Sequence, residues 1–258
     1  VDDSCRERLN NRPSVERIDP QEWIGLYLER DNATISLDTS GGSLHRRGYR
    51  EEGGEAPMQE IIAGAMIRLS GWDGSKPLYD PLCGSGTLLS EALMTCCRIP
   101  GAYLRKRFGF QSLPDYDETL WLTVKQEMDR TMRQLPEGLI SGSDRSSKAV
   151  DSARRNLMEL PRGERVTLRV ADFRTLQGLQ DRVIVCNPPY GIRLERSTDL
   201  SALYRDLGDF LKHQCTGASA FVYFGNREWI AHVGLKPSWK KILKSGGLDG
   251  RLVKYEIY

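Results

Sequence analysis

The most specific chemistry in the sequence lies in the turn Asn187-Pro188-Pro189-Tyr190, which follows the apolar run Val183 to Cys186. Two consecutive prolines fix φ and donate no N–H, so the turn carbonyls remain available as acceptors. Asn187 adds a side-chain acceptor. Together, Asn187 Oδ1 and the Pro188 carbonyl could hold an exocyclic amino group with its lone pair aimed at an electrophilic methyl group, while Tyr190 stacks on the base. A rigid corner without a ligand is the alternative.

Acidic residues lie where three other strands are expected to end. Asp80 begins Asp-Pro-Leu-Cys-Gly84-Ser-Gly86, between a strand and a helix, where glycines let backbone approach a ligand. Asp144 and Asp172 close the next two strands, and carboxyl strand ends meet at the ligand crevice of a doubly wound sheet. One carboxylate there can accept two ribose hydroxyls, and another can accept from an adenine amino group. Taken singly, the loop is also compatible with a plain turn and the aspartates with helix N-caps.

Other nucleotide sites fit the sequence poorly. A dinucleotide fingerprint places its third glycine where this chain has Leu89, and the next acid at a strand end, Asp144, is much farther on than the expected ~20 residues. The Gly-Lys-Ser/Thr sequence of a triphosphate-binding loop is absent.

Alternating apolar patterns predict the elements that position these residues. We expect strands at 77–83, 139–143, 166–170, 183–186 and 218–224, and helices at 58–69, 85–97, 146–160 and 200–214. This order predicts an α/β fold with a doubly wound, mostly parallel sheet. Residues 239–243 and 252–257, joined by a turn at 245–247, predict a terminal antiparallel hairpin on that sheet.

The remaining segments are less regular. Residues 23–38 predict a β-hairpin, and the Gly53-Gly54 pair reads as a hinge. The long connection from Cys97 to Leu139 carries apolar residues that suggest a helix within it. Because the chain starts at Val1 with a polar, proline-punctuated stretch, we expect it to belong to a longer protein.

Composition narrows the class of protein. The 258 residues carry 37 Lys+Arg and 35 Asp+Glu, and 39% are hydrophobic, so a sizeable core is expected and intrinsic disorder is not. No apolar run approaches the ~20 residues of a membrane span, so no membrane partner is expected. Six cysteines without Cys-x-x-Cys spacing favour a reduced, cytoplasmic setting, and with three scattered histidines they give no metal site.

The combined motifs carry a resemblance. Asp80-Pro-x-Cys-Gly-Ser-Gly, Asp144, Ala171-Asp172-Phe173 and Asn187-Pro-Pro-Tyr-Gly resemble the class I S-adenosylmethionine-dependent methyltransferases that methylate amino groups. More narrowly, His45-Arg-Arg-Gly-Tyr-Arg and Ala56-Pro57-Met-Gln-Glu60 resemble the RNA guanine-N2 methyltransferases that carry a THUMP domain. The likeness covers about residues 43 to 258.

The resemblance implies a seven-stranded Rossmann-like sheet, S-adenosyl-L-methionine as cofactor, and a role for each matching residue. Gly84 and Gly86 would lie against the methionine and ribose, with Asp80 supporting their turn. Asp144 would hold the ribose hydroxyls, and Asp172 with the Phe173 backbone would contact adenine. Asn187, Pro188, Pro189 and Tyr190 would handle the target amino group. For Glu60, closing the cofactor pocket and a plain solvated helix charge are both open.

The implied reaction is methyl transfer to N2 of guanosine in RNA, with 23S ribosomal RNA favoured and tRNA second. DNA adenine-N6 or protein glutamine methylation would use the same turn, and a non-catalytic RNA-binding platform is a further alternative. The resemblance divides the chain into a partial THUMP-like segment, 1–44, and a catalytic domain, 45–258. Basic stretches at Arg46, Arg47 and Arg50 and at 98–107 suggest an RNA track, or simply solvated charge.

Overall fold

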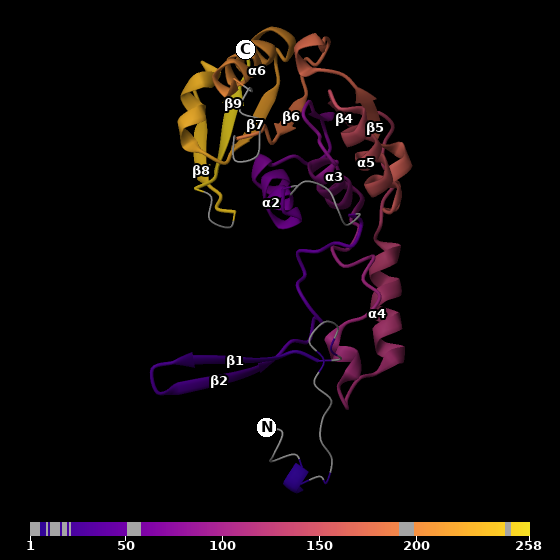
Figure 1. Cartoon of the computed structure of the whole chain (residues 1–258). Helices are drawn as coiled ribbons and strands as arrows, with labels where there is room; N and C mark the ends of the chain where they lie inside the picture. Colours follow the sequence, from indigo (N-terminus) through magenta and orange to yellow (C-terminus); the bar gives the residue numbers. More distant parts are fainter. Residues whose placement is uncertain are drawn as a thin grey trace. The chain divides into compact units, whose positions relative to one another are not determined.

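The computed structural model describes residues 6–8, 10, 16, 20, 22–50, 58–190, 199–245 and 249–258 (Figure 1). The chain forms two compact units: Val1–Leu44 with Arg105–Gln126, and His45–Leu104 with Glu127–Tyr258. Several sequence-based expectations lie outside the described residues, namely the Gly53-Gly54 hinge, Ala56 and Pro57 before the helix, Gly191 after the turn, and Gly246-Gly247.

The second unit is built on a seven-stranded sheet in the order β5-β4-β3-β6-β7-β9-β8. Its first five strands in chain order run parallel, whereas β9 pairs antiparallel with both β7 and β8. The predicted mostly parallel sheet with a C-terminal antiparallel hairpin is confirmed. The strands are β3 (Leu78–Asp80), β4 (Ile140–Asp144), β5 (Thr167–Val170), β6 (Val183–Cys186), β7 (Ser219–Phe224), β8 (Trp239–Ile242) and β9 (Arg251–Glu256).

Helices cover both faces of this sheet, because its central strands carry apolar residues on each side. Along β6, Val185 packs in one core with residues of α2 and α3, while its neighbours Ile184 and Cys186 pack in a second core with residues of α6. The helices are α2 (Glu60–Ser70), α3 (Thr87–Cys97), α5 (Ser147–Met158) and α6 (Leu200–Gln214), with 3-10 turns η2 (Gly163–Arg165), η3 (Phe173–Thr175) and η4 (Arg227–Val233).

Two boundaries differ from the sequence-based expectation for local reasons. The strand expected at 77–83 ends at Asp80, because Pro81 has no N–H to donate to a neighbouring strand. The helix expected from residue 85 begins at Thr87, because Gly86 adopts a left-handed conformation at the N-cap position.

The first unit contains the expected hairpin, β1 (Ile24–Glu29) paired with β2 (Asn32–Leu37). Every residue of both strands is exposed. The unit also contains η1 (Gly109–Ser112) and the start of α4 (Glu118–Arg130), the helix expected inside the long connection. Phe108, Phe110 and Trp121 pack ring against ring there.

Two arginines of the suggested RNA track have structural partners in this first unit. The Arg105 guanidinium donates hydrogen bonds to four consecutive backbone carbonyls, from Ser40 to Ser43. Arg107 donates to the Pro20 carbonyl. These side chains therefore hold residues 105–107 against the chain before Leu44, and the RNA track expected at these residues stays a prediction.

Candidate active site

A cavity of about 1160 Å³ opens at the carboxyl ends of β3 and β6. These neighbouring strands flank the point where the strand order reverses, which is where doubly wound sheets bind ligands. Four expected site residues line it: Glu60, Asp80, Gly84 and Asn187. Gly86, Asp144, Asp172, Phe173, Pro188, Pro189 and Tyr190 are not among the lining residues.

The loop after β3 owes its shape to its glycines. Gly84 and Gly86 have φ of +53° and +82°, values that side chains rarely allow. A Cβ on Gly84 would meet no atom within 4 Å, so this residue faces open space, whereas a Cβ on Gly86 would stand 3.0 Å from Ala153 Cβ. Gly84 is therefore the glycine that a ligand can approach, and Gly86 lets α3 pack against α5.

Asp144 connects two strand ends. Its Oδ2 accepts from the Gly84 N–H and its Oδ1 from the Ser146 N–H, each at 3.0 Å. The carboxylate is half-buried, and each oxygen keeps a second lone pair for another donor. The N-cap of α5 is Ser146 rather than Asp144.

Asp80 is the buried acid of the crevice, with 1% of its surface exposed. Burial raises the pKa of Asp80 well above its usual range, and the negative charge of Asp144 adds to that rise. The Leu82 N–H, 3.0 Å from Oδ1, opposes it. A cation in the cavity would reverse this balance by favouring the ionised carboxylate.

Asp172 lies at the end of β5, where it caps η3 by accepting from the Arg174 N–H. Its carboxylate also pairs with the Arg174 guanidinium at 3.1 Å, and Arg174 continues to Asp206. Phe173 is buried edge-to-face against Phe210. The structure thus gives Asp172 a capping role, and its contact with adenine stays a prediction.

The turn after β6 contains a buried polar atom, Oδ1 of Asn187, that has no partner in the described part of the chain. Asn187 lines the cavity, and its Oδ1 is buried without a hydrogen-bond partner among the described residues. Buried polar atoms are paired in the great majority of cases, so an unpaired acceptor at a cavity wall points to a donor brought by a ligand.

Sequence reasoning missed the second wall of the cavity, which Arg50 and Thr87 form together. Arg50 donates to the Met58 carbonyl at 2.8 Å and to Thr87 Oγ1 at 3.0 Å. It also lies 3.8 Å from Glu60 Oε1, so Glu60 is a buried, paired group and not a solvated helix charge. The interpretation of Arg50 as part of an RNA track is thereby corrected.

Arg47 belongs to the same buried network. Its guanidinium contacts both oxygens of Glu91, at 3.1 and 3.3 Å. Burial raises the pKa of Glu91, and Arg47 opposes that rise. Arg47 and Arg50 therefore anchor the chain to α2 and α3. The signal in the sequence was one acid in each mostly apolar helix, Glu60 in α2 and Glu91 in α3.

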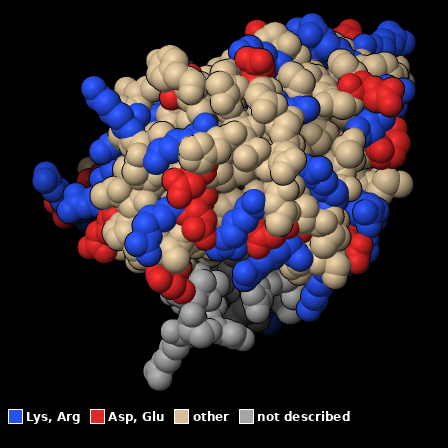
Figure 2. Space-filling view, turned by 90° about the horizontal axis from the view of Figure 1, so that it is seen from above, with Lys and Arg blue, Asp and Glu red and all other residues tan. Residues whose placement is uncertain are grey.

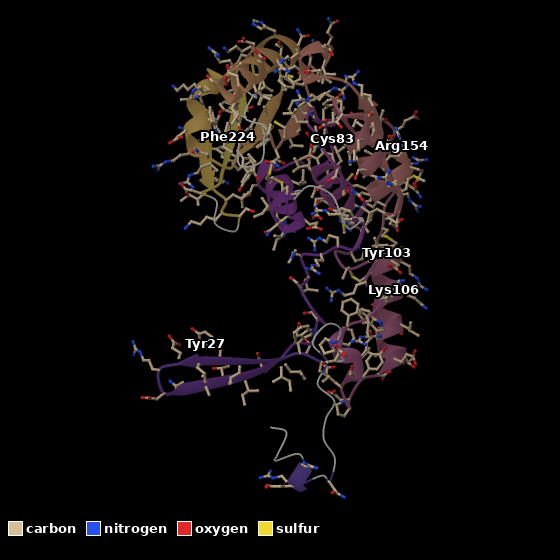
Figure 3. The ribbon with its side chains drawn as sticks, viewed as in Figure 1. Tyr27, Cys83, Tyr103, Lys106, Arg154 and Phe224 are labelled. Atoms are coloured by element: carbon tan, nitrogen blue, oxygen red, sulfur yellow. The ribbon has the colours of Figure 1, made fainter. Side chains whose placement is uncertain are left out.

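In Figure 3, the labelled Cys83 lies in the loop after β3, beside the cavity, and the labelled Phe224 lies at the end of β7. Cys83 also lines the cavity, but burial raises the pKa of its thiol, so the thiol stays protonated.

Among the described residues there is no cluster of His, Cys, Asp or Glu able to hold a metal ion. No helix in the described part of the chain is long and apolar enough to span a membrane.

The sheet order and the crevice define a doubly wound α/β domain of the kind that binds a nucleotide-like cofactor at its strand ends. Residues 47–254 match the family UPF0020, the RMKL-like methyltransferase domain. The chain belongs to this family.

Curated relatives agree with that assignment. The Synechocystis sp. protein slr0064, provisionally named an RNA methyltransferase, is 35% identical over 99% of this chain and 67% of its own length. The ribosomal RNA large subunit methyltransferases K/L of Photobacterium profundum and Syntrophotalea carbinolica are 35% and 36% identical. These matches cover 95% and 100% of this chain but only 35% and 38% of those proteins, so the chain spans about a third of their length.

Solved structures share the fold. The crystal structure of SMU.472 in complex with SAH has a TM-score of 0.85 and 32% identity, covering 98% of this chain and 67% of that one. TrmN from Thermus thermophilus has a TM-score of 0.69 at 16% identity, covering 99% of this chain and 65% of that one, a likeness of fold alone.

Proposed function

We propose that this chain is the catalytic part of an S-adenosylmethionine-dependent RNA methyltransferase that modifies the exocyclic N2 of guanosine, with 23S ribosomal RNA as the first substrate and tRNA as the second. The observation that carries the proposal is the buried, unpaired Asn187 Oδ1 in the wall of the cavity. An unsatisfied buried acceptor costs about 1–3 kcal/mol, which a donor on the substrate would offset. The K/L relatives support the choice of ribosomal RNA.

The cofactor is S-adenosylmethionine, in keeping with the methyltransferase family and with the SAH complex of a relative. The cavity offers groups of both signs for its methionine end. Arg50 and the uncapped N-terminus of α3 at Thr87 suit the carboxylate. Glu60 and Asp80 suit the ammonium group, and Gly84 leaves space for the chain between them.

We assign the nucleoside end of the cofactor to the other strand ends. Asp144 would accept the ribose hydroxyls with its remaining lone pairs while it holds Gly84 in place. Asp172 and the Phe173 backbone would contact adenine. Gly86 would contribute through the packing of α3 rather than by contact.

The cofactor supplies a methyl group on a sulfonium centre. The protein contributes geometry: Asn187 Oδ1 and the Pro188 carbonyl accept the two N–H groups of the guanine amino group, which leaves its lone pair directed out of the base plane. The same two acceptors stabilise the positive charge that develops on nitrogen. Positioning of this kind can contribute ~7–11 kcal/mol.

Two further contributions follow from the residues of the turn. Tyr190 stacks on the base once it has been extruded from the RNA, a contact worth about 1–3 kcal/mol. The methylated nitrogen is acidic and loses its proton to water, so no strong general base is required.

The test is Asn187→Ala, with Gln134→Ala, which removes an exposed amide away from the cavity, as the control. We expect transfer of a radiolabelled methyl group to RNA to fall by a factor of at least 100, because the acceptor that orients the amino group is lost. Affinity for S-adenosylhomocysteine, measured by calorimetry, should stay within twofold. Normal turnover by Asn187→Ala would remove the proposed role.

The substrate is tested by incubating the unaltered chain with transcripts of 23S ribosomal RNA and tRNA, with duplex DNA, and with protein. Mass spectrometry of digested RNA should find N2-methylguanosine. Label on DNA adenine or on glutamine would identify the competing amino-methylating reactions, and cofactor binding without any transfer would identify a non-catalytic platform.

We further propose that residues 1–44 are the last portion of a THUMP-like segment and that residues 45–258 form the catalytic domain. Support comes from the family match at 47–254 and from the hairpin, whose apolar face is exposed at Leu26 and Ile35. Tyr27, labelled in Figure 3, lies on the opposite, polar face. If this segment docks RNA, Tyr27→Ala should weaken RNA binding in a filter assay; unchanged affinity would count against it.

A further inference from the structure

The Tyr204 side chain reaches from α6 to the turn after β6. Its hydroxyl donates a hydrogen bond to the Pro189 carbonyl at 3.1 Å. Tyr204 has 0% of its surface exposed. Burial raises the pKa of Tyr204 far above its usual value, so the hydroxyl remains a donor at every working pH.

Two aromatic neighbours hold the Tyr204 ring in place. Phe224 stacks on it with centroids 5.5 Å apart and planes at 22°, and Trp229 stacks at 5.5 Å and 6°. A side chain packed between two rings has little rotational freedom, so the position of its hydroxyl is fixed by β7 and η4.

The turn needs a donor from outside. Pro188 and Pro189 lack the N–H groups that lock most turns, so the turn presents carbonyls with few donors of its own. Tyr204 satisfies the Pro189 carbonyl, which lies next to Pro188 and two residues from Asn187. The two groups assigned to the substrate amino group are therefore adjacent to the anchored carbonyl.

We propose that Tyr204 is a positioning residue: by binding the Pro189 carbonyl it sets the orientation of the Pro188 carbonyl and Asn187 Oδ1 toward the amino group that is methylated. This inference rests on the proposed function. It predicts that the Tyr204 hydroxyl governs the rate of transfer and leaves the binding of cofactor and RNA unchanged, because neither ligand is assigned to Tyr204.

The experiment compares Tyr204→Phe with Tyr255→Phe. The first variant keeps both ring stacks and removes one hydroxyl. The second removes the hydroxyl of another fully buried tyrosine in the same core, which has no hydrogen-bond partner among the described residues. Both variants should fold and melt close to the parent temperature.

For Tyr204→Phe we expect kcat to fall at least tenfold, with KM for RNA and affinity for S-adenosylhomocysteine within twofold. Tyr255→Phe should match the parent in all three. Parental kcat in Tyr204→Phe, or equal losses of kcat and cofactor affinity, would overturn the proposal.

A second measurement does not depend on activity. Cys186 immediately precedes Asn187, and its buried side chain packs in the same core as Tyr204, so its alkylation, mapped by peptide mass spectrometry, reports opening of the contact between α6 and the end of β6. The rate should rise several-fold in Tyr204→Phe and not in Tyr255→Phe. If the parent chain transfers no methyl group, the proposed function fails. The alkylation rate of Cys186 still decides whether Tyr204 holds the turn. An unchanged rate in Tyr204→Phe would overturn that anchoring role.

Discussion

The Gly84 N–H donates a hydrogen bond to Asp144 Oδ2 at 3.0 Å, so a side chain at the end of β4 fixes the loop that follows β3. The other carboxylate oxygen accepts from Ser146 at the start of α5. One aspartate side chain thus links the end of β4, the loop after β3 and the start of α5 by hydrogen bonds. Asp144 shapes the loop between β3 and α3, in addition to the ribose contact proposed for it.

Asp144→Asn tests this double role. An amide can accept only one of the two N–H bonds and turns a donor toward the other, so we expect affinity for S-adenosylhomocysteine to fall roughly tenfold or more, the effect of losing a charge-assisted bond of about 1.5–3 kcal/mol. Asp151→Asn is the control, because that carboxylate is exposed and pairs with the exposed Arg154 one turn along α5. Calorimetry measures both. Equal affinities in the two variants would contradict the assignment.

Asp80 should make stability depend on pH. Below the usual aspartate pKa the carboxyl is protonated in both the folded and the unfolded chain. As the pH rises, it ionises first in the unfolded chain, because burial raises the folded-state pKa. The free energy of unfolding therefore falls with rising pH until the folded-state pKa is reached.

Asp80→Asn removes that loss, so its melting temperature should exceed the parent value at pH 7 by more than at pH 4. A gain of about 1 kcal/mol would appear as roughly 2–4 °C. Asp73→Asn should shift in the opposite direction, because hydrogen bonds from Ser75 lower the pKa of that exposed carboxyl. Melting curves across this pH range decide, and a difference independent of pH would refute the prediction.

Arg50→Gln tests the assignment of the methionine end. S-adenosylhomocysteine carries the amino-acid carboxylate and 5′-methylthioadenosine lacks it, so the variant should bind the first at least tenfold more weakly and the second unchanged. Methylthioadenosine therefore also reports whether the pocket is intact. Arg154→Gln, an exposed arginine labelled in Figure 3, should affect neither ligand. Equal weakening of both ligands would show that Arg50 only supports the fold.

Much of the fold was predictable because its signals are local. The alternation of strands and helices is encoded within a few residues at a time, whereas the expected bounds of one strand and one helix overlooked the effects of Pro81 and Gly86. The grouping of Arg105–Gln126 with the first unit was not predictable, because it depends on Arg105 binding carbonyls more than 60 residues earlier.

The site divides in the same way. Asp80, Gly84 and Asn187 could be singled out because each lies at the end of a strand or in the turn that follows one. Arg50 was missed because it was grouped with the basic residues Arg46 and Arg47. Its partners Glu60 and Thr87 become its neighbours only in the fold. On the face in Figure 2, cationic and anionic side chains are interspersed, so the basic stretches of the sequence do not form one continuous cationic surface there.

Gly225 should be required for the position of Tyr190. A Cβ at residue 225 would stand 2.6 Å from Tyr190 Cγ and Cδ2, so the backbone after β7 lies against that ring. Tyr223 contacts the same ring edge-on, with centroids 6.5 Å apart. We expect Gly225→Ala to displace the Tyr190 ring and to lower methyl transfer at least tenfold, with cofactor affinity retained.

The double variant separates this effect from a general loss of stability. In a Tyr190→Ala background the ring is gone, so Gly225→Ala should cost nothing further, and the two changes should be strongly non-additive. Transfer rates of the two single variants and the double variant form the complete cycle. Additive losses would mean that Gly225 acts through another contact and that the ring does not depend on it.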